Sequence, residues 1–93
     1  MKHSDLEVWK KSIELVYKTY AITRQFPSEE RYTLGNQINR AVISIPSNIA
    51  EGAGRDSFKE YIRYINIANG SLNELETQLI LVNGLKLGDT SEM

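Results

Sequence analysis

The residues with the greatest potential for chemistry lie around a glycine-containing turn in the middle of the chain. Asn48 and Glu51 are three residues apart, on neighbouring positions of one helical face, and Arg55 follows across the turn. Glu60 falls in the first turn of the next predicted helix. These side chains can therefore meet at one end of a helical bundle. Two interpretations stay open: a polar network that fixes the turn, which we favour, or a recognition surface in which Arg55 binds a phosphate or carboxylate.

The sequence offers little for catalysis. Its single histidine, His3, lies next to the N-terminus, and it has no cysteine. The Glu-x-x-His pairs with which helical bundles bind two metal ions do not occur. Gly52 and Gly54 do not follow a predicted strand, as the glycines of a dinucleotide-binding loop would. We therefore predict a protein that is not an enzyme and has neither a cofactor nor a metal site.

Basic residues are concentrated in the first two thirds of the chain. Residues 1–63 hold ten basic residues against eight acidic ones, whereas residues 64–93 hold one against four. Some basic residues alternate with tyrosines, a mixture that can grip a nucleic-acid backbone and stack on bases. Aromatic residues at helical spacing belong more often to a core, so an ordinary mixed surface is the favoured alternative. The candidate nucleic-acid contacts are Lys10, Lys11, Lys18, Arg24, Arg55 and Arg63.

Three amphipathic helices are predicted to position these residues in a single domain. In each of them apolar residues recur with the 3.6-residue period of an α-helix. Ser4 with Glu7, and Ser57 with Glu60, have the spacing of a capping box and mark the starts of the first and third helices. The domain covers residues 1–93, and its helices are expected at about 5–25, 29–51 and 58–87.

Proline and glycine interrupt these helices at defined points. Pro46 lies inside the second helix and predicts a kink, because it removes a backbone hydrogen bond. Gly52 and Gly54 are expected to end that helix in a left-handed conformation, and Gly88 to end the third. Gly70 lies in the middle of the third helix, where glycine costs about 1 kcal/mol relative to alanine. A close approach of another helix is therefore expected at Gly70.

The third helix has apolar residues outside its main seam. The seam alternates spacings of four and three residues, which suits nearly parallel packing against other helices. Tyr64, Ile67 and Leu81 lie off this seam, so the helix is expected to contact more than one partner. In a chain of 93 residues the second partner can be another copy of the protein. The seam residues are Tyr61, Ile65, Ala68, Leu72, Leu75, Leu79 and Val82.

The two ends of the chain bear on its location and completeness. The N-terminus lacks the apolar core of a signal peptide, and no apolar run approaches the ~18 residues of a membrane span. A cytoplasmic location without membrane contact is expected. Asp89–Glu92 has the pattern of a helix start with no helix behind it. A further helix is therefore expected to be truncated or missing.

Several segments together resemble a known family. They are DLEVWKKSIELV near the start, QINRAVIS in the centre, and SIPSNIAEGAGRDSFKEYIRYINIANGSLNELETQL from residue 44 onward. They resemble the four-helix-bundle proteins encoded in intervening sequences of bacterial 23S rRNA genes, also called S23-type ribosomal proteins. The chain is also similar to the accessory protein of diversity-generating retroelements. The matching motif positions are Ile45, Pro46, Asn48, Glu51, Gly52, Arg55, Ser57, Glu60, Gly70, Ser71, Leu72, Glu74 and Glu76.

The resemblance implies a fold, an assembly and a class of function. The fold is an antiparallel up-down bundle of four helices, of which three are recorded here. The assembly is a ring-shaped homopentamer. The implied function is nucleic-acid binding, to rRNA or DNA, and the alternative is a protein-interaction scaffold that binds no nucleic acid. The matching positions are expected to serve packing, the turn or an interface, and none is expected to be catalytic.

Overall fold

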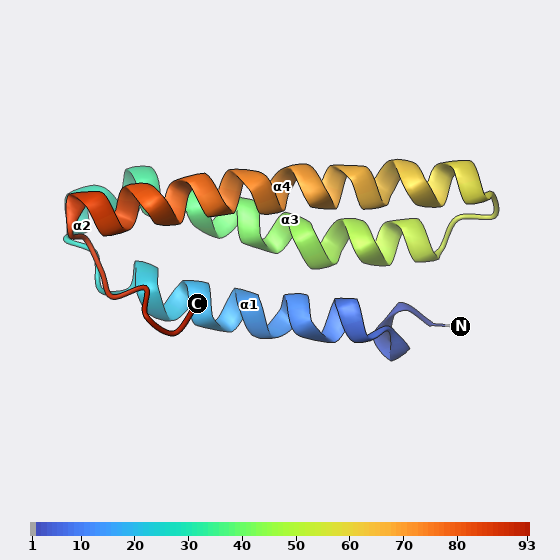
Figure 1. Ribbon diagram of the computed structural model, residues 1–93, viewed down its shortest axis with the longest axis horizontal. Coiled ribbons are helices and arrows are strands. Elements are labelled where there is room, and N and C mark those ends of the chain that lie inside the picture. The colour runs from blue at the N-terminus through green and yellow to red at the C-terminus, as the bar shows by residue number, and fades with distance from the viewer. Residues whose placement is uncertain (1) are drawn as a thin grey trace.

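Three long helices run side by side along most of the molecule (Figure 1). They are α1 (Glu7–Thr23), α3 (Asn36–Ala53) and α4 (Phe58–Leu85), and a short 3-10 turn, η1 (His3–Asp5), precedes them. The computed structural model describes residues 2–93, which include no strand and measure 44 × 20 × 19 Å along the principal axes. The predicted all-α fold is confirmed. A fourth long helix stays a prediction.

The ends of α1 are set by backbone contacts that the sequence pattern did not indicate. The capping box predicted for Ser4 and Glu7 is wrong: Ser4 lies in η1, and Leu6 precedes the helix without a side-chain cap. At the other end, the Arg31 guanidinium donates to the carbonyl oxygens of Arg24 at 3.3 Å and Phe26 at 3.2 Å. Because the last carbonyls of a helix have no partner inside it, Arg31 stabilises this end.

The second helical segment contains one departure from α geometry. It starts with α2 (Ser28–Glu30), continues through the π-helical turn η2 (Arg31–Gly35) and runs on as α3. The sequence gave no signal for η2. Pro46 lies buried inside α3, which stays α-helical from Asn36 to Ala53, so a kink at Pro46 stays a prediction.

The core is built around α3, which lies between α1 and α4 and packs against both (Figure 1). Its residues Ile38, Val42, Ile45 and Ile49 are each at most 6% exposed. The helices α1 and α4 make few direct contacts with each other. An apolar groove of about 150 Å³ therefore remains beside α3, and Val8, Ile45, Ile49, Ile65, Ala68, Asn69 and Leu72 line it.

The glycines do not act as predicted. Gly54 follows α3 with φ −88°, so the left-handed ending predicted there is wrong. The helix α4 ends at Leu85, and Lys86 adopts the left-handed conformation with φ 57°. Gly88 packs instead against Ile22, with a Cβ position only 3.3 Å from that side chain. No helix approaches Gly70: a Cβ there would meet nothing within 4 Å, so the predicted close approach is not made within residues 2–93.

The last residues fold back from α4 across α1 (Figure 1). The Asp89 amide donates to the Gln25 side-chain oxygen at 2.9 Å. The Asp89 carboxylate accepts a hydrogen bond from the Ser91 amide at 2.9 Å, and this contact lowers the pKa of Asp89. Asp89 therefore starts a turn, as its sequence pattern indicated. Among residues 2–93, none of the helices is both long and apolar enough to cross a membrane.

Replacing Lys86 by glycine should stabilise the fold. The left-handed conformation costs an ordinary residue roughly 1–2 kcal/mol, and glycine adopts it freely. We expect Lys86→Gly to raise the free energy of unfolding by about 1 kcal/mol in urea denaturation. Lys86→Ala is the control and should give no such gain. An equal gain from both variants would show that removal of the lysine side chain, and not the backbone, is responsible.

Candidate functional site

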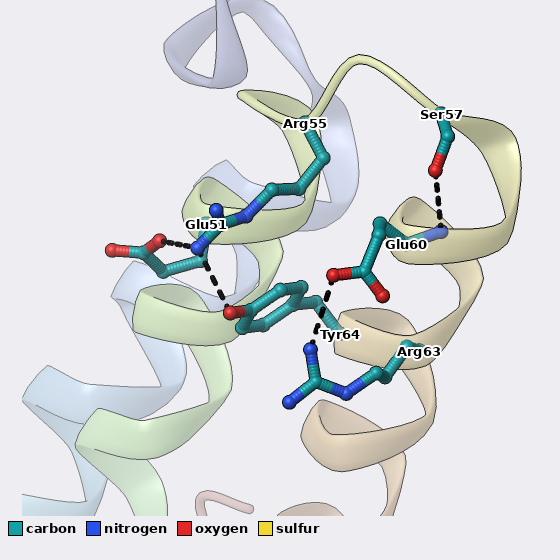
Figure 2. A network of polar contacts seen from close by, with 6 residues as sticks. All are labelled: Glu51, Arg55, Ser57, Glu60, Arg63 and Tyr64. Atoms are coloured by element: carbon teal, nitrogen blue, oxygen red, sulfur yellow. Dashed lines mark hydrogen bonds and ion pairs between the residues drawn. The ribbon is translucent and has the colours of Figure 1, made fainter.

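A network of polar contacts joins the end of α3 to the start of α4 (Figure 2). The Nη2 atom of Arg55 donates to the Glu51 carboxylate at 2.9 Å and to the Tyr64 hydroxyl at 2.8 Å. On α4 itself, Arg63 donates to the Glu60 carboxylate at 3.2 Å. The structure thus brings Glu51, Arg55 and Glu60 to one end of the bundle.

Tyr64 is the centre of this network. The guanidinium carbons of Arg55 and Arg63 lie 4.8 and 5.0 Å from the centroid of its ring (Figure 2). The face of an aromatic ring carries partial negative charge and attracts cations at such distances. Tyr64, predicted only as an interface residue, is half-buried and holds two arginines from different segments together.

The start of α4 is fixed by Ser57. Its hydroxyl accepts a hydrogen bond from the Glu60 amide at 3.1 Å, which satisfies one of the donors that a helix start leaves free. The Glu60 carboxylate pairs with Arg63 and not with the Ser57 amide, so only half of a capping box forms. The exchange links the cap to the contacts around Tyr64.

Gly52 allows α4 to approach α3 closely below this network. A Cβ at Gly52 would lie 3.0 Å from the Tyr64 Cβ and 3.2 Å from the Tyr61 carbonyl oxygen. Gly54, two residues on, has no contact shorter than 3.7 Å at the same position. Glycine is therefore required at Gly52 for packing, and at Gly54 it is not.

The ion pairs of the network are too exposed to contribute much stability. The side chains of Arg55 and Glu51 are 41% and 60% exposed, and those of Arg63 and Glu60 are 57% and 44% exposed. Such pairs contribute about 0.3–0.5 kcal/mol each. An anion that bound Arg55 would also have to compete with Glu51. The geometry therefore suits the fixing of a turn better than the binding of a ligand.

Asn48 belongs to a different cluster. Its side-chain amide donates to the Ser44 carbonyl at 2.8 Å and to the Ser44 hydroxyl at 2.9 Å. The Ser44 hydroxyl is in turn 2.8 Å from that of Ser71 on α4. The predicted convergence of Asn48 with Arg55 is therefore wrong. Sequence reasoning missed the serine pair, whose only signal is a small polar residue at a matching level of each helix.

The candidate nucleic-acid contacts fall into two groups. Lys10 pairs with Glu7 at 3.4 Å, and Arg55 and Arg63 pair with glutamates as described. Lys11, Lys18 and Arg24 have no ion pair within residues 2–93. All three lie on α1 or at its end, and Arg24 borders a surface hollow with Val16, Tyr17 and Tyr20.

The remaining candidates lie apart from this network. Ile67 and Leu81 are 41% and 47% exposed on α4. His3 lies edge-on against the Trp9 ring, 5.2 Å away between centroids. Among residues 2–93, no three histidine, aspartate or glutamate side chains gather as a metal ion would require. Asp89, far from the network, is the one described group whose pKa is clearly shifted.

The two glycines of the turn provide a direct test of this packing. Gly52→Ala should lower the free energy of unfolding by about 1–3 kcal/mol, because the new methyl group would overpack the contact with Tyr64. Gly54→Ala is the matched control, and its change should lie between zero and a gain of about 1 kcal/mol. Urea denaturation measures both. Equal effects of the two substitutions would contradict the close approach at Gly52.

Comparison with known proteins places the chain in a family. No curated protein shows significant similarity to it. The sequence profile of one family, described as 23S rRNA-intervening sequence protein, matches residues 4–93, nearly the entire chain. The all-α fold and the long match agree with the resemblance carried by the segments around residues 5–16, 37–44 and 44–79. The chain therefore belongs to the 23S rRNA-intervening sequence protein family.

Proposed function

We propose that this protein is a non-catalytic binding module that works in the cytoplasm as an assembly of identical copies. The observation that carries this proposal is the apolar surface of α4. Six of its large aliphatic residues are at least 38% exposed, although a small domain has little apolar surface to spare. Exposed apolar patches of this kind mark sites of protein contact. The six residues are Ile62, Ile67, Leu72, Ile80, Leu81 and Leu85.

The charge distribution supports an interface on the same helix. From Tyr64 to Leu85, α4 has only two charged residues, Glu74 and Glu76. The exposed face of a surface helix ordinarily carries many charged residues, whereas the cores of protein interfaces are depleted of them. The groove between α1 and α4 adds a second apolar surface available to a partner.

The family supports the finer parts of the proposal. A closed ring of five copies, and a likeness to the accessory barrel of retroelements, rest on the sequence resemblance. The proposal that the module is not an enzyme rests on the residues themselves. The polar network around Tyr64 is exposed and internally paired, and such a site lacks the displaced pKa values that catalytic acids and bases need.

Self-association can be tested on the apolar face of α4. Wild-type protein should sediment as an oligomer, and Ile67→Gln with Leu81→Gln should shift it toward the monomer. Glutamine keeps a helix propensity close to that of leucine, so the helix should remain. Tyr32→Gln, at a residue 74% exposed but outside α4, is the control and should not change the sedimentation coefficient. A wild-type protein that stays monomeric at high concentration would contradict the proposal.

Nucleic-acid binding is a second candidate function, favoured by the unpaired cations of α1. Lys11, Lys18 and Arg24 are free of carboxylate partners within residues 2–93, and tyrosines line the hollow beside Arg24. This combination can hold phosphates and stack on bases, in rRNA or in DNA. A protein scaffold without nucleic-acid binding is the alternative.

The salt dependence of binding distinguishes these two. If the three cations contact phosphates, replacing all three by alanine should reduce the slope of log K against log salt by about 3, because each contact releases roughly one counterion. Arg63→Ala, at a paired arginine, is the control and should leave the slope nearly unchanged. Filter binding to duplex DNA and structured RNA measures this. No binding at low salt would leave only the scaffold.

A further inference from the structure

The outward side of α4 has an open track along its length. Gly70, Thr77 and Gly84 are seven residues apart, so they lie along one line of the helix. A Cβ built at either glycine would meet nothing within 4 Å. Ile67 and Leu81 flank this line on one side, and Asn66, Asn73 and Ile80 flank it on the other. We call these eight residues the α4 outer face.

Nothing within the chain accounts for this composition. Glycine in an exposed helix is unfavourable relative to alanine, and here two occur where alanine would fit without contact. Ile80 is 66% exposed and Leu81 47% exposed next to them. Open glycines bordered by exposed aliphatic side chains have the shape that receives the side chains of a second helix.

The charges around the α4 outer face indicate what that helix carries. Glu74 and Glu76 flank the face and are exposed, and there is no cation from Tyr64 to Leu85. On the opposite side of the molecule, the exposed surface of α1 presents cations that have no ion pair within residues 2–93, namely Lys11, Lys18 and Arg24. The two surfaces are therefore complementary in charge.

The two surfaces are also complementary in shape. Tyr17 projects from α1 between these cations and is 69% exposed. It borders the hollow formed with Val16, Tyr20 and Arg24. A large exposed ring on α1 and open glycines on α4 form a knob and a notch on one protein, and such a pair joins copies head to tail.

We propose that the α4 outer face of one copy docks on the outward surface of α1 of a second copy. Tyr17 lies against the open glycines of its partner helix, and Glu74 and Glu76 face Lys11, Lys18 and Arg24 of the second copy. This inference rests on the proposed self-association and names the two surfaces that make the contact. Because the surfaces differ, the contact is heterologous and repeats from copy to copy.

Charge reversal with rescue is the decisive experiment. Glu74→Lys with Glu76→Lys should weaken self-association by about tenfold or more, because like charges then face each other. Lys11→Glu with Lys18→Glu should do the same. The chain that carries all four changes should recover assembly to within about threefold of wild type, since the attraction is restored with its sign reversed. Sedimentation velocity over a concentration series measures each variant.

A control separates contact from net charge. Asp56→Lys with Glu92→Lys changes the net charge by the same amount at exposed residues outside both surfaces, and should leave assembly unchanged. If this variant weakens assembly as much as the glutamate pair does, or if the fourfold variant shows no rescue, the proposed contact is wrong.

Gly70 provides a second, independent readout. Gly70→Leu should raise the melting temperature of the monomer, because leucine is the better helix former and the space is open. It should also weaken assembly by about tenfold or more, because it fills the notch that receives Tyr17. A stability defect cannot imitate opposite changes in these two measurements. Unchanged assembly in Gly70→Leu would overturn the proposal.

The remaining outcomes also decide between occupants. If Ile67→Gln with Leu81→Gln abolishes assembly but the charge variants do not, the copies associate by another route, and only the pairing with α1 fails. If wild type is monomeric, self-association itself fails. If Lys11→Glu with Lys18→Glu removes binding to duplex DNA or structured RNA and leaves assembly intact, the α1 surface is a nucleic-acid site and the proposed docking is wrong.

Discussion

The burial of α3 is the constraint on which the rest of the structure depends. Its apolar residues Ile38, Val42, Ile45 and Ile49 are almost fully buried, and a single neighbouring helix could not cover them all. The helices α1 and α4 must therefore lie on different sides of α3, where they hardly touch each other. The groove between them, and the outward position of much of α4, follow directly from this arrangement.

The polar network around Tyr64 serves the same constraint. For α4 to cover the end of α3, the chain must reverse within a few residues and return at close range, which Gly52 permits. Arg55 then links Glu51 on α3 with Tyr64 on α4, and Ser57 starts the returning helix. The individual contacts are exposed and weak, so their value lies in setting the direction of the turn.

Local patterns in the sequence were enough to predict the helices and part of the turn, because both depend on near neighbours. Apolar periodicity placed the three long helices, and the spacing of Glu51, Arg55 and Glu60 placed them at one end. Contacts between distant residues left no such pattern. The Ser44–Ser71 pair, the Arg31 contacts at the end of α1 and the π-helical turn η2 all depend on how the segments pack.

Gly70 shows how packing changes the meaning of a residue that the sequence had already singled out. A glycine inside a helix suggests a close approach, and the most economical assumption is an approach by a helix of the same chain. The core, however, turns this part of α4 outward, where the glycine meets nothing. The cost to the helix remains, and so does the absence of cations around it. An advantage that offsets this cost must then come from outside the single chain, and the basic surface of α1 on a second copy has the charge and the exposed ring to supply it.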